Sequence, residues 1–510
     1  MPRKPKPKNT LSAGERAAIY EAEKAEKAGN AAEAQDTEKL SSAKAQTDPP
    51  EKASKVEEKQ PLPKPQHVTV DVDFSMPVGQ VKAMHGFCNG PVSYGADISE
   101  LFREIGVPQV RFAETDTALS AYAVDVSRIF KDTSRDPRDS SAYDFSYTDK
   151  YVTAAYNAGS KVIFRLGESV DRMHSGKSAA LPLDTDLFVE VCANIVRHYN
   201  DYWADGFAFG IEYFEIWSID RDQERSSAFE LYRRVASALK LIDSSLKVGG
   251  CGFDSIADVR DFVRYCQRRR APIDFITLCA FSGDPLSLVD SVMDVVPYMH
   301  NCGFPNAEIV IGAWNYIDTS SLGKLSLDEV MSSSQAQFCE ARRNLFSAQS
   351  SVKGAAYALA FMISLGNVKE VSRACYYDAQ PYLSAWCGIS DRFGNPQKPF
   401  YAFKAYGEVY RAQNQVYSAC HKAEGFAHSG IYALAAEGEN ALYVLISSFD
   451  GCGIVDLRLD SIPENIYTAD IYMLDGVKDM TLADSVAISG AKKRLLLNIS
   501  RYGAALVKLY

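Results

Sequence analysis

Carboxylate side chains follow several short apolar segments of this sequence that are typical of buried strands. Six that come soon after such segments are Glu114, Asp116, Glu168, Asp220, Asp222 and Asp284. A carboxyl group can donate or accept a proton in a transition state, so these residues are candidates for general acid–base catalysis. Whether they can act together depends on the elements that position them.

The apolar segments alternate with segments of helical periodicity. The strand candidates are Met84–Cys88, Gln109–Phe112, Lys161–Phe164, Tyr213–Trp217, Lys247–Gly250, Phe275–Leu278, Glu308–Ile311 and Ala374–Tyr377. The helix candidates between them include Ile98–Ile105, Thr148–Ala158, Leu187–Tyr202, Ser227–Ile242, Ile256–Arg269, Leu286–Cys302 and a stretch from Leu327 to Leu365. Eight strands alternating with helices predict a parallel (β/α)8 TIM barrel, with the carboxylates at the carboxyl ends of its strands, where active sites form.

Different patterns flank this α/β region. After Ala412 the helical spacing stops and short alternating strands predict an all-β sandwich over 413–510. The segment 67–80 begins with an alternating strand, Val68–Phe74, that has no place in the barrel, so we expect it to join the sandwich. Residues 1–66 are rich in Lys, Glu, Ala and Pro and have little to bury, which predicts a disordered tail. The barrel is then expected over 81–412.

Composition excludes several classes of protein. The 510 residues carry a net charge of −10, which argues against a dedicated nucleic-acid binder. No apolar run approaches the ~20 residues that cross a bilayer, and the N-terminus has no apolar signal region, so we expect a cytoplasmic protein with no membrane partner. The seven histidines lack metal-ligand spacing and there is no phosphate-binding loop, so neither a metal nor another cofactor is expected.

Several fragments recur, in order and spacing, in one family of enzymes. They are Gly86–Pro91, Leu101–Gly106, Val110–Phe112, Val124–Ser127, Tyr143–Ser146, Phe164–Ser169, Tyr213–Trp217, Leu231–Tyr232, Val248–Gly250 and Lys398–Lys404. Together these fragments resemble glycoside hydrolase family 39 over about residues 80–410. The resemblance implies a retaining glycosidase of the β-xylosidase or iduronidase type, with a barrel beside a β-sandwich and two catalytic carboxyl groups about 5–5.5 Å apart.

The residues at the family's catalytic positions differ in this sequence. The family's acid/base glutamate stands after strand 4 in Trp-Asn-Glu-Pro, and here the motif is Trp217-Ser218-Ile219-Asp220. Its nucleophile glutamate ends strand 7 before an aromatic residue and Asn, and here Ala313 precedes Trp314 and Asn315. The strand 6 pattern His-x-Tyr appears as Cys279-Ala-Phe281. Isoleucine cannot carry a proton and alanine cannot form a glycosyl ester, so the resemblance implies a catalytically degenerate homologue.

Other residues near the expected barrel mouth could still bind a saccharide. They are Arg111, Trp217, Ser218, Cys279, Phe281, Trp314, Asn315 and Trp386. The tryptophans could stack on sugar rings or lie in the core, and Arg111 could contact a ligand or be structural. The main hypothesis is a carbohydrate-binding or scaffolding pseudoenzyme.

One alternative is an active hydrolase that uses relocated carboxylates, for example Asp220, Glu114 or Glu168. For Glu168 the competing interpretation is a structural pairing with Arg165. A further alternative is a structural protein whose N-terminal tail binds a protein partner.

Overall fold

The computed structural model describes most of the chain after residue 65. The described residues are 66–93, 95–113, 116–117, 121–169, 180–217, 224–318, 340–341, 343–344, 347–381, 386–421, 430–451 and 453–510. The expected disordered tail therefore lies outside the described residues, apart from Gln66. Residues 63–510 form one compact unit.

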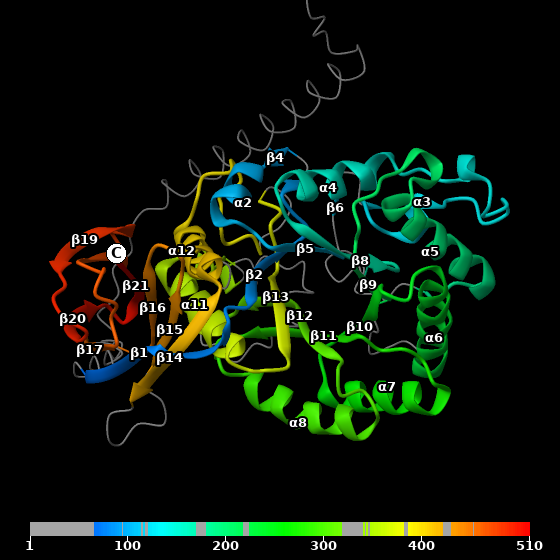
Figure 1. Cartoon of the computed structure of the whole chain (residues 1–510). Helices are drawn as coiled ribbons and strands as arrows, with labels where there is room; N and C mark the ends of the chain where they lie inside the picture. Colours follow the sequence, from blue (N-terminus) through cyan, green and yellow to red (C-terminus); the bar gives the residue numbers. More distant parts are fainter. Residues whose placement is uncertain are drawn as a thin grey trace, which may run out of the picture. The chain divides into compact units, whose positions relative to one another are not determined.

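Eight parallel strands close into a barrel, as the alternation of strands and helices predicts (Figure 1). In chain order they are β2 (Ala83–Cys88), β5 (Gln109–Phe112), β8 (Lys161–Leu166), β9 (Tyr213–Ile216), β10 (Lys247–Phe253), β11 (Phe275–Ser282), β12 (Glu308–Tyr316) and β13 (Val371–Tyr376). Each expected strand segment overlaps one of them. The TIM-barrel prediction is confirmed.

Helices lie outside the barrel strands (Figure 1). They are α2 (Ser99–Ile105), α3 (Val126–Ile129), α4 (Ser146–Asn157), α5 (Thr185–Asn200), α6 (Arg225–Ile242), α7 (Ile256–Arg269), α8 (Val289–Asn301), α11 (Val352–Gly366) and α12 (Lys398–Ala412). Two short 3-10 turns, Ser140–Ala142 and Trp203–Asp205, lie between them.

The helix α7 shows how the sequence specifies these elements. Ser255 caps its first turn, since its side chain accepts a hydrogen bond from the backbone N–H of Ala257 at 3.2 Å. Val259, Phe262 and Val263 are fully buried and, with Cys266, follow the i, i+3, i+4, i+7 spacing of one helix face. That face packs inward, and the helix ends at two arginines that complement the negative end of its dipole.

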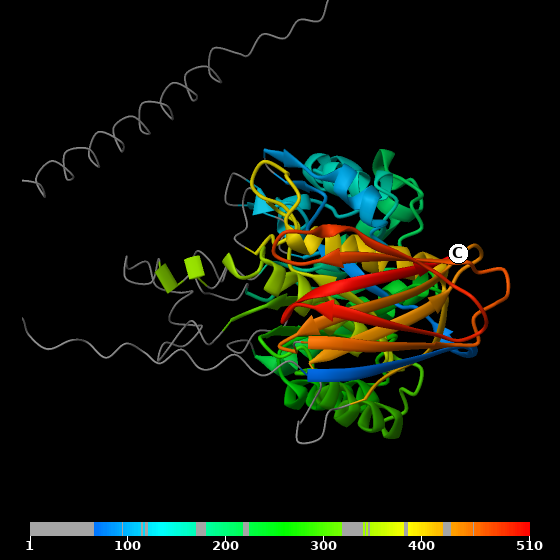
Figure 2. The same cartoon turned by 90° about the vertical axis from the view of Figure 1, so that its left-hand side faces the viewer.

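A nine-stranded sheet lies beside the barrel and faces the viewer in Figure 2. Its order is β19 (Asp479–Ala487), β18 (Thr468–Leu474), β21 (Tyr502–Leu509), β16 (Leu442–Phe449), β15 (Ile431–Glu437), β14 (Asn414–His421), β1 (Gln66–Gln80), β17 (Gly453–Asp460) and β20 (Lys493–Ile499). The expected class, a TIM barrel with an all-β sandwich, is confirmed. Sequence periodicity did not indicate β14 or β19.

The first strand holds this sheet together. β1 pairs antiparallel with β14 and parallel with β17, so it joins two strands that come more than 330 residues later in the chain. Val68, Val70 and Val72 are at most 3% exposed, which is the alternation that the sequence shows. The division of the chain into domains at 80/81 and 412/413 stays a prediction.

Barrel and sheet share one hydrophobic core. Leu434 and Leu445 of the sheet belong to the same buried cluster as Phe361 of α11. The hydroxyl of Ser447 on β16 also donates to the backbone carbonyl of Ala356 on α11, at 2.7 Å. The two parts therefore stabilise each other. In the described part of the chain, no helix is long and apolar enough to cross a membrane.

Candidate functional site: the barrel mouth and the end of strand β8

The seventh barrel strand, β12, presents alanine where the family resemblance places a nucleophile. Ala313 pairs with Cys279 of β11, and its side chain lies in the cluster that fills the barrel interior. Val310 belongs to the same cluster, three residues earlier, because the pairing of β12 with β13 shifts register between Ile311 and Trp314. Ala313 is 5% exposed, so this position carries a small apolar side chain with little room around it.

Phe281 and Tyr377 pack against the cluster that contains Ala313, and the ring of Trp386 lies beside both of them. The rings of Phe281 and Trp386 are 5.2 Å apart, and Tyr377 lies 5.9 Å from Phe281 and 6.2 Å from Trp386. We call these three residues the mouth aromatic cluster. Asn315 supports it from below, since its fully buried amide donates hydrogen bonds to the backbone carbonyls of Tyr377 and, at 2.9 Å, Trp386. Asn315 thus orients the cluster and has its donors already engaged.

The other two tryptophans that the sequence singled out are buried. Trp314 stacks on Phe361 at 4.4 Å, on the helix side of the barrel wall. Trp217, 1% exposed, ends β9 with a φ of 60°, a left-handed conformation that bulky residues rarely adopt and that concentrates at functional sites. Its edge contacts the ring of Phe188, 5.7 Å away. Both indoles are packed away from the mouth aromatic cluster, and Trp217 also lines a cavity at the end of β8.

Arg111 forms an ion pair within the barrel. Its Nε and one terminal nitrogen donate to the two carboxylate oxygens of Glu215 at 2.5 and 2.9 Å, and both side chains are at most 3% exposed. A planar guanidinium bound to both oxygens of a carboxylate is a rigid, well-satisfied pair. This geometry favours the structural interpretation of Arg111. Glu215 stands in an otherwise apolar strand segment, a signal that sequence analysis did not use.

Arg165 on β8 pairs with Asp125 rather than with the side chain of Glu168. Its guanidinium lies 2.6 Å from the Asp125 carboxylate and donates to the backbone carbonyl of Glu168 at 2.7 Å. Asp125 also accepts hydrogen bonds from Ser169, from the backbone N–H at 2.9 Å and from the hydroxyl at 2.7 Å. The expected pairing of Arg165 with Glu168 is corrected, because the carboxyl group of Glu168 points toward α3.

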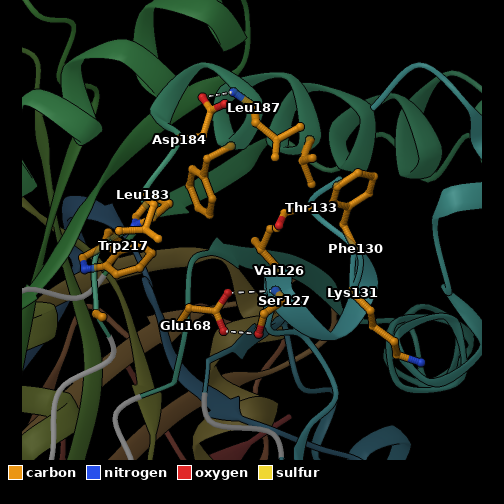
Figure 3. Close-up of a pocket in the computed structure, with 14 residues that line it drawn as sticks. Val126, Ser127, Phe130, Lys131, Thr133, Glu168, Leu183, Asp184, Leu187 and Trp217 are labelled. Atoms are coloured by element: carbon orange, nitrogen blue, oxygen red, sulfur yellow. Dashed lines mark hydrogen bonds between the residues drawn. The ribbon is translucent and has the colours of Figure 1, made fainter. Parts of the chain in front are cut away.

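The carboxyl group of Glu168 is held by Ser127 (Figure 3). One of its oxygens accepts from the backbone N–H of Ser127 at 2.8 Å and the other from the hydroxyl at 2.6 Å. Burial raises the pKa of Glu168 to about 7, and the negative charge of Asp125 adds to the effect. Among the carboxylates the sequence named, Glu168 therefore titrates near neutral pH.

Several predicted residues lie outside the described part of the chain. They are Glu114, Ser218, Ile219, Asp220 and Asp222, and Asp116 is described only in its backbone. Asp284 is exposed and accepts a hydrogen bond from the N–H of Leu286 in its own loop. Within the described residues, no group of three His, Cys, Asp or Glu side chains could hold a metal ion.

Comparison with known proteins supports the family resemblance that the sequence fragments indicate. Residues 124–295 match the model of Glycosyl hydrolases family 39, a range narrower than the one on which the sequence fragments resemble the family. A β-xylosidase of Geobacillus stearothermophilus is 25% identical over 161 residues, which are 28% of this chain and 31% of that enzyme. The chain therefore matches about a third of that relative's length.

Solved structures share the fold over most of the chain. A glucosidase from Croceicoccus marinus superposes with a TM-score of 0.68 at 20% identity, covering 87% of this chain and 99% of that one. A monomeric β-xylosidase from Caulobacter crescentus superposes with a TM-score of 0.61 at 16% identity, covering 86% and 99%. The family match and the relative confirm the resemblance of this chain to glycoside hydrolase family 39, and the superpositions confirm the fold.

Proposed function

We propose that this protein is a catalytically degenerate family 39-like glycosidase that binds a carbohydrate at the barrel mouth. The observation that carries the proposal is Ala313 near the end of the seventh barrel strand, paired with Cys279 and in a cluster against which Phe281 and Tyr377 pack. A retaining glycosidase needs a carboxylate nucleophile and a carboxylic acid about 5–5.5 Å apart. Alanine cannot attack an anomeric carbon, and Ile219, at the acid/base position of the sequence motif, cannot protonate a leaving oxygen.

The mouth aromatic cluster is the proposed contact surface for the sugar. Phe281 and Trp386 are both partly exposed, and their rings meet edge to face at 63°. Such an arrangement offers apolar faces to the C–H groups of a pyranose while Asn315 holds the backbone beneath it. Arg111 and Trp314 are not part of this surface because their packing partners already cover them, and Trp217 is not part of it because it lines a different cavity, at the end of β8.

A second candidate function, an active hydrolase with relocated carboxylates, is favoured by one observation. The raised pKa of Glu168 leaves that carboxyl group largely protonated just below neutral pH, as a general acid requires. Its charged neighbour Asp125 is engaged by Arg165 and Ser169, which leaves it poorly placed to attack a sugar. This candidate would need Asp220 or Glu114 as the second carboxylate.

Turnover distinguishes the two candidates. The full chain is incubated with aryl β-xyloside, β-glucoside, β-galactoside and α-iduronide substrates, and release of the aryl alcohol is compared with that of the Glu168→Gln and Asp220→Asn variants. If the enzyme is degenerate, the amount of aryl alcohol released is expected to be no greater than in buffer without protein. Release that collapses in either variant would replace the first candidate with the second.

Binding is tested separately on a saccharide array. Trp386→Ala is expected to weaken binding of any captured sugar at least about fivefold, because stacking against an aromatic ring contributes on the order of 1 kcal/mol. Tyr467→Ala removes an exposed aromatic side chain just before β18 and serves as the matched control. Equal losses in the two variants, or no captured saccharide at all, would contradict binding at the barrel mouth.

A further inference from the structure

A cavity of about 490 Å³ lies at the end of β8, between α3 and α5 (Figure 3). Its walls are mainly apolar and include Val126, Phe130, Leu183, Leu187, Phe188 and Trp217. This volume lies within the range of pockets that hold small organic ligands. The residues of the mouth aromatic cluster do not line it, so the cavity is a separate feature from the proposed sugar site.

Glu168 is the acidic group that lines this cavity beside Ser127. Each carboxylate oxygen accepts one hydrogen bond from Ser127, which fixes the orientation of the group and leaves a second lone pair on each oxygen. A carboxylate has about four acceptor sites, so a ligand that donates hydrogen bonds can bind without displacing Ser127.

The charges around Glu168 favour a positively charged ligand. Lys131 also lines the cavity, but it pairs with Asp144 at 2.5 Å, and in Figure 3 its side chain points away from Glu168. Arg165 is paired with Asp125. Asp184 is the second acidic residue of the lining and caps the start of α5 by accepting from the N–H of Leu187 at 3.0 Å. The lining therefore carries an excess of negative charge.

We propose that this cavity binds a small organic cation, a primary ammonium on an aromatic or branched apolar body, with the ammonium on the Glu168 carboxylate and the apolar body against Phe188 and Trp217. The ammonium supplies the hydrogen-bond donors and the charge that the carboxylate lacks, and the aromatic walls favour a cation near their faces. An anionic ligand would be repelled, and a neutral alcohol would gain the apolar contacts alone.

This arrangement makes binding depend on pH. The groups that face Glu168 are Asp125 and Arg165, the Ser127 hydroxyl, and Cys192 on α5, whose pKa burial raises. With the pKa of Glu168 at about 7, the free carboxyl group is largely protonated at low pH and must lose its proton to hold the ammonium. The affinity is therefore expected to rise about 30-fold between about pH 5.5 and pH 8 and to level off above the pKa.

The test uses the full chain and three probes. Phenethylammonium, which stays protonated across this pH range, its neutral isostere phenethyl alcohol and the anion 3-phenylpropionate are titrated by ligand-observed NMR from about pH 5.5 to pH 8. Glu168→Gln keeps the size of the side chain and removes its charge. Asp186→Asn makes the same charge change at an exposed carboxylate on α5 that pairs with Arg234 and does not line the cavity.

The expected result is saturable binding of phenethylammonium whose affinity rises about 30-fold from about pH 5.5 to pH 8. The alcohol should bind with an affinity that does not depend on pH, and the anion should not bind. In Glu168→Gln the ammonium should lose at least about tenfold in affinity and its pH dependence, since the charged hydrogen bonds are gone. The alcohol should bind Glu168→Gln unchanged, and Asp186→Asn should behave as the wild type. Equal, pH-independent affinities for ammonium and alcohol, or no saturable binding of the ammonium, would overturn the proposal.

Discussion

A buried histidine gives this fold a defined sensitivity to acid. His85 lies on β2 and is 0% exposed, with its ring 4.8 Å from that of Tyr410 and 5.3 Å from that of Tyr406 on α12. Neither ring nitrogen has a hydrogen-bond partner within the described part of the chain. The pKa of His85 is lowered from 6.5 to about 3, chiefly by burial; the backbone of Gly106 opposes this shift and the nearby charge of Arg411 adds to it.

The size of the effect follows from this shift. Below pH 6.5 the unfolded chain binds a proton at His85 and the folded chain does not, so the stability contributed by the neutral ring is present at neutral pH and falls as the pH drops toward 3. With these two pKa values, the free energy of unfolding falls by about 2 kcal/mol between pH 7 and pH 5 on account of His85. Replacing the ring with a side chain that cannot titrate removes that dependence.

The measurement is urea unfolding of wild type and His85→Leu at pH 7, 6 and 5. The substitution also changes packing, but packing contributes equally at each pH, so the difference between the two proteins at pH 7 is subtracted from the difference at pH 5. We expect the free energy of unfolding of His85→Leu, relative to that of the wild type, to rise by about 2 kcal/mol from pH 7 to pH 5. His300→Leu, at an exposed histidine of α8, controls for the loss of one histidine. A gain below about 0.5 kcal/mol, or the same gain in His300→Leu, would refute the reasoning.

Three further outcomes follow from the structure. Arg111→Leu should cost about 3–5 kcal/mol of stability in urea unfolding because it leaves Glu215 charged and unpaired, and adding Glu215→Leu should recover much of the loss; equal stability of the single and double variants would contradict this. A chain that begins at residue 81 lacks β1 and with it the buried side chains of Val68, Val70, Val72 and Phe74, so it should be at least about 6 kcal/mol less stable than one that begins at residue 63 and unfold at a lower temperature; unchanged thermal unfolding would show that β1 is dispensable. Glu168→Gln should stabilise the protein more at pH 8 than at pH 4.5, because the raised pKa of the native carboxyl group costs stability as the pH rises through 7; thermal unfolding at both pH values measures it, and a pH-independent difference would argue against the shift.

The fold could be predicted because its signals are local and repeated. Each barrel strand is a short apolar run, and the spacing of Val259, Phe262 and Val263 in α7 identifies its buried face without reference to any partner. Strand β19 shows the limit, because its side chains are mostly exposed and its sequence, from Asp479 to Ala487, has no clear apolar alternation. Its pairing with β18 is a tertiary contact that periodicity does not encode.

The site was less predictable because the charged residues that pair in it are far apart in the sequence. Arg111 and Glu215 are 104 residues apart, and Asp125 and Arg165 are 40 apart, so the sequence showed charged residues in apolar strands without showing which would pair. Sequence proximity suggested Glu168 as the partner of Arg165. The carboxyl group of Glu168 instead points to α3, and only the backbone carbonyl of Glu168 accepts a hydrogen bond from the guanidinium of Arg165. The cavity beside it depends on how α3 and α5 pack, which neither segment reveals alone.

The proposed loss of a nucleophile at position 313 fits the chemistry of its surroundings. A glutamate at position 313 would place a carboxylate among Cys279 and the mouth aromatic cluster, where desolvation penalises the charged form. Arg111, whose Nε lies beside Gly312, already gives two hydrogen bonds to Glu215 and so is poorly placed to compensate a second carboxylate fully. Alanine at 313 avoids that cost and keeps the barrel interior apolar above the ion pair. Among the described residues, the surroundings of Ala313 above this ion pair are apolar, and a single Ala313→Glu change would introduce a carboxyl group without the polar setting that a nucleophile needs.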